Sequence, residues 1–219
     1  MIAVIDCGIG NIGSVLNMLK KIGVDAIASS DINVIKEADK LILPGIGSFD
    51  SAMQKLKSID LVEDLNRIVL DKKTPILGIC LGMQLMTKSS EEGKLPGFGW
   101  IDARTVKFKF DISTEKLRLP HIGWNFVNVN KNKDFFKKIN DEVRFYFVHS
   151  YHVACNLPED IMTTTDYGYN FVSSFQHENI FGVQFHPEKS HQYGMNFLQS
   201  FIEGNCSPSS RGLTAGSSK

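Results

Sequence analysis

The sequence predicts an α/β protein with a mostly parallel central sheet, helices on both faces of that sheet, and an antiparallel, β-rich C-terminal half. In the first hundred residues, short apolar runs alternate with stretches of helical periodicity, which is typical of a parallel sheet that is buried on both faces. From about Trp100 the helical periodicity stops, and short β-rich runs follow one another with only turns between them. The chain of 219 residues, 42% of them hydrophobic and 22% charged, is long enough to bury one sizeable core.

The elements of the first half can be placed in order. Residues 2–6 (IAVID) read as a buried strand, and apolar residues at helical spacing follow from Ile12 until Gly23 ends the helix. The later elements are a strand at 26–29, a short helix opened by Asp31, a strand at 40–44, a helical region at 49–70, a strand at 74–80 and a helix that begins near Leu81.

The second half is expected to be mainly strands. The β-rich runs cover residues 103–110, 124–130, 144–153, 161–167, 171–176 and 180–185. A last amphipathic helix carries Met195, Leu198, Phe201 and Ile202. We expect one domain over residues 1–203, followed by a Ser/Gly-rich tail over 204–219 that is disordered or an expression remnant.

Charge and composition narrow the class of protein. The 24 basic and 24 acidic residues balance to a formal charge of zero without a long single-sign block, so we expect no nucleic-acid and no membrane partner. The longest apolar runs are strand-sized, and the start of the chain lacks the features of a secretion signal. Four widely spaced cysteines without a CxxC pair favour free thiols in a reducing cytoplasm. Without a ligand pattern such as HExxH, we expect no metal and no cofactor.

A glycine motif near the N-terminus suggests a dinucleotide site. Gly8, Gly10 and Gly13 fit G-x-G-x-x-G between a strand and a helix, and Asp25 or Asp31 lies about where an acidic ribose ligand is expected. However, the β-rich second half leaves few residues for a second mononucleotide-binding unit. We therefore favour a tight turn at a crowded sheet edge.

The stretch GICLGMQ, residues 78–84, predicts a nucleophile. Cys80 lies at a strand-to-helix corner between Gly78 and Gly82, which is the setting of a nucleophile elbow. The sharp corner forces unusual backbone dihedrals and leaves no room for neighbouring Cβ atoms. The amides of the next helix favour the thiolate, and the amide of Leu81 can bind an oxyanion. A packing cysteine would explain the residue type but not both glycines.

A nucleophilic cysteine needs a base and a group that orients the base. In VQFHPEKS, His186 ends a strand and Glu188 follows two residues later, with Pro187 fixing the turn. An extended chain points residues i and i+2 to one side, so Glu188 is expected to hold the imidazole in the tautomer that accepts the thiol proton. The alternative is a strand-end histidine beside a solvated glutamate, and the elbow cysteine elsewhere in the chain argues against it.

These motifs together resemble a known family. G-x-C-x-G followed much later by H-P-E resembles the class I, triad-type glutamine amidotransferases, and LPGIGSF is similar to the segment that supplies their second oxyanion amide. PHIGWN, YFVHSY and GVQFHPEKS resemble the glutaminase subunits of imidazole glycerol phosphate synthase, a branch of that family, and the resemblance covers residues 1–203. It implies a flavodoxin-like glutamine amidotransferase domain that docks on a separate (β/α)8 cyclase subunit.

The resemblance also implies roles for individual residues. Cys80 would attack the carboxamide of glutamine, and His186, oriented by Glu188, would move the proton to the leaving ammonia. The amides of Leu81 and of the Gly45–Ile46 stretch would stabilise the oxyanion. The glutamine contacts would be Gln84, His149, Ser150 and Tyr151, and the partner interface would include Asn11, Trp124, Tyr146 and Lys189. Core packing is the alternative for Tyr151, strand pairing for Ser150, and ordinary surface for the interface residues.

Other functions stay open at this point. A paralogous branch resembles the same subunit but delivers ammonia to a sugar amidotransferase in surface-polysaccharide synthesis, and a triad cannot separate the two. Cys7 and Gly13 depart from the residues that are common in the histidine-pathway subunits, and both lie in the expected docking region. A non-catalytic binding module is disfavoured because nucleophile, base and orienting group are all present. A cysteine peptidase or a γ-glutamyl hydrolase fits fewer of the motifs.

Overall fold

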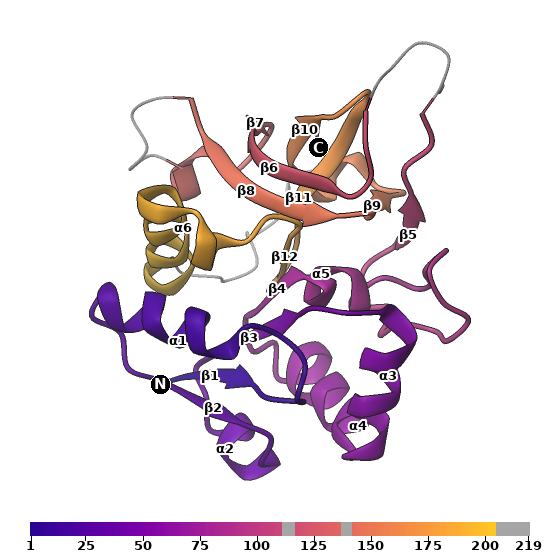
Figure 1. Ribbon diagram of the computed structural model, residues 1–219. Coiled ribbons are helices and arrows are strands. Elements are labelled where there is room, and N and C mark those ends of the chain that lie inside the picture. The colour runs from indigo at the N-terminus through magenta and orange to yellow at the C-terminus, as the bar shows by residue number, and fades with distance from the viewer. Residues whose placement is uncertain (111–116, 137–141, 205–219) are drawn as a thin grey trace, which may run out of the picture.

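The computed structural model describes residues 1–110, 117–136 and 142–204 (Figure 1). The first half alternates strands and helices: β1 (Ile2–Ile5), α1 (Ile12–Lys21), β2 (Ala26–Ser29), α2 (Ile32–Lys36), β3 (Lys40–Gly45), α3 (Phe49–Ser58), α4 (Leu61–Asn66), a π-helical turn (Arg67–Asp71), β4 (Ile76–Cys80) and α5 (Leu81–Leu85). The second half is β-rich: β5 (Ala103–Lys107), β6 (His121–Phe126), β7 (Asn128–Val129), β8 (Arg144–His149), β9 (Tyr151–Cys155), β10 (Ile161–Asp166), β11 (Asn170–His177) and β12 (Ile180–Val183). Short 3₁₀ turns cover Lys133–Phe136, Pro158–Asp160 and Pro187–Lys189, and α6 (His191–Glu203) ends the described chain.

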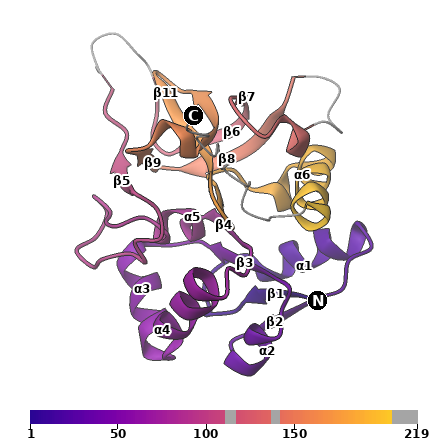
Figure 2. The same ribbon diagram turned by 180° about the vertical axis from the view of Figure 1, so that it is seen from behind.

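One mixed sheet joins the two halves. Within the described residues its strand order is β2-β1-β3-β4-β12-β11-β10-β7, with β9 branching from β11 and β5 pairing with β9. The pairs from β2 to β12 are parallel, and the pairs beyond β12 are antiparallel. The predicted fold class is therefore confirmed. In both views the α/β half lies at the bottom and the β-rich half above it (Figures 1 and 2).

Alternation along the strands divides the core into two layers. In β1, Ala3 and Ile5 face the layer covered by α2, α3 and α4, while Ile2 and Val4 face the layer covered by α1 and α6. Successive side chains of a strand point to opposite faces, so an apolar run such as β1 buries both of its faces. Figure 1 shows α6 (yellow) beside α1 (indigo) on the second of these layers.

β12 connects the halves. It pairs in parallel with β4, with Gly182 opposite Gly78 and Val183 opposite Ile79. Its other edge pairs antiparallel with β11. The chain that leaves β12 therefore emerges beside the corner that ends β4. This pairing brings together two sites that are separated by about half of the sequence.

Three predicted elements are divided in the structure. The run 124–130 is divided at Val127, because β6 pairs with β8 whereas β7 pairs with β10. The helical region 49–70 breaks at Asp60, whose φ of 55° is left-handed and ends α3 before α4 begins. The run 144–153 is two strands separated at Ser150, because β8 pairs with β6 whereas β9 pairs with β5 and β11. The predicted tail begins at 204, and residues 205–219 lie outside the described part of the chain.

The glycine motif forms a tight turn. Gly8 and Gly10 have φ angles of 71° and 116°, and a Cβ on Gly10 would lie 3.2 Å from the backbone of Pro44 at the end of β3. Asp31 uses its carboxylate to cap α2, accepting from the backbone N–H of Asn33 at 2.9 Å. The glycines thus permit a close backbone approach, which agrees with the tight-turn interpretation.

No helix of the described residues is long and apolar enough to cross a bilayer. Those residues also contain no group of three or more His, Cys, Asp or Glu side chains that is arranged to hold a metal ion.

Candidate active site

Cys80 lies at the corner between β4 and α5. Its φ and ψ angles are 55° and −109°, a region that non-glycine residues rarely adopt. A Cβ on Gly78 would lie 2.7 Å from the carbonyl of Gly82, and a Cβ on Gly82 would lie 1.8 Å from the carbonyl oxygen of Leu43. Both glycines are therefore required for α5 to pack against β3 and β4. The strained backbone presents the sulfur at the carboxyl end of the parallel strands, where sites of α/β proteins form.

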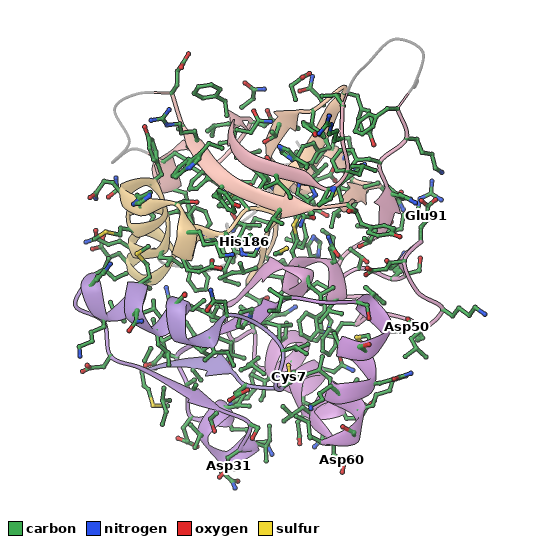
Figure 3. The ribbon with its side chains drawn as sticks, viewed as in Figure 1. Cys7, Asp31, Asp50, Asp60, Glu91 and His186 are labelled. Atoms are coloured by element: carbon green, nitrogen blue, oxygen red, sulfur yellow. The ribbon has the colours of Figure 1, made fainter. Side chains whose placement is uncertain are left out.

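His186 and Glu188 form a buried pair. The Nδ1 atom of His186 lies 2.8 Å from Oε1 of Glu188, and each side chain is only 2% exposed. Figure 3 labels His186 near the middle of the molecule, where the two halves meet. An extended chain was predicted from His186 to Glu188, but Glu188 lies in the 3₁₀ turn Pro187–Lys189. The turn, rather than strand alternation, therefore returns the carboxylate to the imidazole.

The electrostatics of His186 reveal its second partner. Burial by itself would lower the pKa of His186, but favourable interactions with Cys80 and Glu188 outweigh burial and raise the pKa to about 10. Because Glu188 occupies Nδ1, the Nε2 atom is the ring nitrogen left for the sulfur, and Nε2 makes no hydrogen bond of ordinary geometry to any described residue. The structure thus pairs the imidazole with the carboxylate and brings the same ring to the cavity that the sulfur lines.

The predicted oxyanion residues lie near the corner that carries Cys80. Gly45 is the register partner of Cys80 in the β3–β4 pair. A Cβ on Gly45 would lie 2.7 Å from the amide nitrogen of Gly82 and 2.9 Å from Cβ of Leu81. Ile46 is 51% exposed, and Gly47 follows with a φ of 100°. Gly45 therefore lies beside the Cys80 corner, and Ile46 and Leu81 line the same cavity as the sulfur. Gly47 has a left-handed conformation that favours glycine.

A cavity of about 330 Å³ opens beside the sulfur. All four predicted glutamine contacts line it. From the first half it is lined by Ile46, Gly47, Cys80, Leu81, Gln84 and Glu92, and from the second half by Pro120, Val148, His149, Ser150, Tyr151, His186 and Lys189. The cavity therefore lies at the junction between the halves, and its size suits a ligand as small as an amino acid.

Glu92 is a cavity residue that the sequence argument missed. Its Oε2 atom accepts a hydrogen bond of 2.9 Å from the backbone N–H of Phe49 at the start of α3. Apart from Glu188, no other carboxylate was predicted near the sulfur. Glu92 follows α5 in a polar loop without periodicity, so only its position twelve residues after the elbow cysteine could have suggested it.

His149 has both ring nitrogens occupied. Its Nδ1 lies 2.8 Å from the carbonyl oxygen of Tyr151, so this nitrogen donates. Its Nε2 lies 2.9 Å from Nδ1 of His121, whose other nitrogen lies 3.3 Å from the amide nitrogen of Asn125. Burial lowers the pKa of His121 to about 4 and the pKa of His149 well below its ordinary value, so both rings are neutral. His149 therefore lines the cavity while it fixes the main chain at Tyr151.

The predicted interface residues divide into two groups. Trp124 is 43% exposed on β6, its ring lies 6.5 Å from that of Tyr146 on β8, and Nζ of Lys189 lies 5.8 Å from the Tyr146 ring. Ile122 and Phe126 are also exposed on β6, at 59% and 49%. Asn11 lies at the start of α1, where its side chain caps the helix by accepting from the backbone N–H of Ser14.

Comparison with known proteins identifies the family of this chain. The family "Glutamine amidotransferase class-I" matches residues 3–204. Among solved structures, the fold is similar to one described as a glutamine amidotransferase, with a TM-score of 0.71 and 14% identity, covering 92% of this chain and 97% of that chain. It is also similar to a glutamine amidotransferase from Thermotoga maritima, with a TM-score of 0.61 and 19% identity, covering 92% of this chain and 81% of that chain. The family match and the site therefore define a class-I glutamine amidotransferase.

Curated relatives narrow this class. Over 203 residues the chain is 52% identical to imidazole glycerol phosphate synthase subunit HisH 2 of Methanococcus maripaludis, covering 93% of this chain and 99% of the relative. The HisH 2 subunit of Pseudomonas aeruginosa is 46% identical with the same coverage, and HisH of Leptospira borgpetersenii is 42% identical over 92% of this chain and 98% of its own length. The chain belongs to the HisH family of class-I glutamine amidotransferases.

Proposed function

We propose that this chain is the glutaminase subunit of an imidazole glycerol phosphate synthase in histidine biosynthesis. It hydrolyses glutamine to glutamate and ammonia and passes the ammonia to a partner subunit, which we propose is a (β/α)8 cyclase. The observation that carries this proposal is the buried arrangement of Cys80, His186 and Glu188 at the wall of the 330 Å³ cavity. The names of the HisH relatives support the choice of acceptor over a sugar amidotransferase.

The first half of the reaction is acyl transfer to sulfur. His186 takes the proton of the Cys80 thiol, and its raised pKa favours the state in which the ring holds that proton. The thiolate attacks the side-chain carbonyl carbon of glutamine, and the carbonyl oxygen becomes an oxyanion. The amides of Leu81 and of the Gly45–Ile46 stretch stabilise this oxyanion, with each donor contributing about 3–4 kcal/mol in comparable enzymes. His186 then donates its proton to the departing nitrogen, so ammonia leaves and a thioester remains.

The second half is hydrolysis of the thioester. His186, again neutral, takes a proton from water, and the resulting hydroxide attacks the thioester carbon. The sulfur leaves as thiolate, glutamate forms, and the proton held by His186 returns the site to its starting state. Glu188 keeps Nδ1 of His186 in its hydrogen bond throughout, so Nε2 is the nitrogen that exchanges protons.

The cavity offers acceptors for the α-ammonium group of glutamine. Glu92 contributes a carboxylate that faces the cavity. Gln84 uses its amide nitrogen to donate to the carbonyl of Tyr151 at 3.1 Å and to Oε1 of Gln184 at 3.0 Å, so only its oxygen remains for a ligand. We propose that these two groups bind the α-ammonium and that Ser150 and Tyr151 bind the α-carboxylate. His149 contributes by holding the Tyr151 carbonyl.

The exposed side of the β6–β8 ribbon supports a docking role. Ile122, Trp124 and Phe126 project from one strand, and the guanidinium of Arg144 lies 5.8 Å from the Trp124 ring. Exposed aromatic and arginine side chains are characteristic of the centres of protein interfaces. Ammonia released into bulk water would be protonated and lost, so the partner must cover the exit. We propose that Trp124, Tyr146, Lys189 and Asn11 lie at this contact.

The partner is also proposed to gate the reaction. If the Gly45–Ile46 amide points away from the sulfur in the free chain, docking of the ligand-bound partner would turn it inward. The left-handed Gly47 next to it supports such a peptide rotation. We expect low glutamate production by the isolated chain and strong stimulation by partner plus its ligand. Full activity of the isolated chain would contradict gating and leave the triad untouched.

Replacement of Cys80 tests the proposed chemistry. Cys80→Ala should abolish glutamate release from glutamine, while the circular dichroism spectrum and partner binding stay unchanged. Cys155→Ala is the matched control, because burial raises the pKa of Cys155 to about 12 and leaves an unreactive thiol. Glutamate release by Cys80→Ala at the rate of the unaltered chain would rule the mechanism out.

Co-purification from cells identifies the acceptor: a histidine-pathway cyclase supports the proposal, and a sugar-modifying enzyme contradicts it. A thiol nucleophile is also consistent with our proposal that the chain works in the reducing cytoplasm.

A further inference from the structure

The sulfur of Cys80 has two polar neighbours besides His186. The amide nitrogen of Gln184 lies 3.6 Å from it, and the carbonyl oxygen of Val148 lies 3.9 Å from it on β8. A carbonyl oxygen only accepts, so Val148 favours the protonated thiol. An N–H only donates, so Gln184 favours the thiolate. The position of the sulfur between these two groups makes the donor important whenever the thiol loses its proton.

The orientation of the Gln184 amide follows from its neighbours. The carbonyl oxygen of Tyr151 can only accept, so the atom of Gln84 that lies 3.1 Å from it must be the nitrogen. The second N–H of that nitrogen points to Gln184 at 3.0 Å, which requires an oxygen there. The nitrogen of Gln184 is then the atom that faces the sulfur. Exchanging N and O in either amide would set two donors or two acceptors against each other.

Rigid elements hold this donor in place. Gln184 directly follows β12, and its backbone N–H donates to the carbonyl of Ser173 at 2.9 Å, which continues the pairing with β11. Gln184 and His186 are two residues apart, and both side chains reach the sulfur, as alternation along an extended chain requires. Gln84 lies one helical turn after Cys80 in α5. The donor is therefore connected to the same two elements that carry the nucleophile and the base.

The free-energy cost of burying the Gln184 amide indicates that this side chain has a functional role. Gln184 has no exposed surface, and burying an amide is unfavourable unless its groups are hydrogen-bonded. Among the described residues, its nitrogen donates to the sulfur alone. A neutral thiol is a weak acceptor, whereas a thiolate is a charged one. The buried amide is therefore satisfied best when the sulfur carries a negative charge.

We propose that Gln184, held by Gln84, donates a hydrogen bond to the reactive sulfur of Cys80 and thereby stabilises and orients the thiolate. This inference rests on the proposed function, since it takes Cys80 as the nucleophile. It adds a fourth side chain to the three predicted for the reaction. It also gives Gln84 a second task, because Gln84 fixes which atom of Gln184 faces the sulfur.

Alkylation of Cys80 by iodoacetamide tests the proposal without glutamine. The rate is measured on the full chain across a pH series, with the Cys80 peptide followed by mass spectrometry. Gln184→Met keeps the length of the side chain but has no donor. We expect alkylation near neutral pH to slow about tenfold, as the loss of a hydrogen bond to a charged group predicts, and the rate profile to move to higher pH. Val183→Ala, at a buried neighbour that carries no hydrogen-bonding side chain, should lower the melting temperature but leave the alkylation profile unchanged.

A second variant separates the donor from packing. Gln184→Glu still offers an oxygen to Gln84 but replaces the N–H with a carboxyl oxygen, so alkylation should again slow. If both variants alkylate at the unaltered rate with an unchanged pH profile, Gln184 is structural and the proposal is overturned, whatever happens to glutamate release.

A measurement on the unaltered chain decides the matter even if both variants fail to fold. The side-chain amide resonances of Gln184 should move as Cys80 ionises and should stop moving in Cys80→Ala. Resonances that do not respond to the thiol would overturn the proposal. Failure of the proposed function is recognised separately, by glutamate release from Cys80→Ala.

Discussion

Substituting Gly82 with alanine should disrupt the active-site corner. The new Cβ would lie 1.8 Å from the carbonyl oxygen of Leu43, whereas ordinary contacts begin near 3.4 Å. The backbone would have to retreat by about 1.6 Å, the difference between these distances. The obstacle is a main-chain atom of β3, so no side-chain rotation relieves it. Overpacking a core costs about 1–3 kcal/mol when side chains can adjust, so we expect Gly82→Ala to lower the free energy of unfolding by about 3–5 kcal/mol.

Gly13→Ala is the matched control, because it makes the same chemical change without the contact. Nothing lies within 4 Å of a Cβ at Gly13, which occupies the first turn of α1. Removing a glycine from a helix should raise the free energy of unfolding by about 0.5–1 kcal/mol. Urea titrations followed by circular dichroism give both values by linear extrapolation.

The two substitutions are therefore expected to have opposite signs. If Gly82→Ala unfolds at the same urea concentration as the unaltered chain, the close approach of α5 to β3 is wrong, and with it the explanation of the glycines around Cys80. Any Gly82→Ala protein that does fold should release little glutamate, because α5 carries the amide of Leu81.

Three further predictions concern other parts of the molecule. Glu188→Gln should lower the pKa of His186 from about 10, measured by NMR titration of the imidazole. The raised pKa of His186 contributes stability fully at pH values below the unfolded pKa of about 6.5, and this contribution is lost as the pH rises through the folded pKa. The unaltered chain should therefore lose more stability between neutral and alkaline pH than Glu188→Gln does. Equal slopes of unfolding free energy against pH in the two proteins would contradict the assignment. Lys40→Met should lower the free energy of unfolding by about 1–2 kcal/mol and speed amide exchange at the end of α6, because Nζ of Lys40 lies 2.8 Å from the carbonyl oxygens of Phe201, Ile202 and Gly204. Trp124→Ala should leave the melting temperature unchanged, since the side chain is 43% exposed, but weaken partner binding by about tenfold or more in calorimetry; unchanged affinity would remove Trp124 from the interface.

Much of the fold was predictable because periodicity reports burial. The apolar runs that became β1, β3 and β4 are buried on both faces, and such strands cannot tolerate polar alternation. Asp31 was recognisable as a helix start because its side chain satisfies a local amide. The break at Asp60 was not predictable, since Asp60 adopts a left-handed conformation within a helical pattern that otherwise continues.

The residues of the candidate site were predictable where a local sequence pattern specifies a backbone turn. A cysteine between glycines signals a corner, and a His-Pro-Glu sequence signals a turn that returns a carboxylate to a ring. Glu92 and Gln184 carry no such local signal. Glu92 reaches the cavity from a loop, and Gln184 faces the sulfur only because β12 pairs with β4, a contact between residues about a hundred positions apart.

The parallel pairing of β4 with β12 also has a consequence during synthesis. Translation produces Cys80 long before His186, the ring that we propose activates it, and the strand pairing that brings the two together can form only after β12 has left the ribosome. Nascent or prematurely terminated chains should therefore be unable to waste cellular glutamine. The order of these residues in the chain therefore prevents glutamine hydrolysis before folding is complete, without a separate inhibitor.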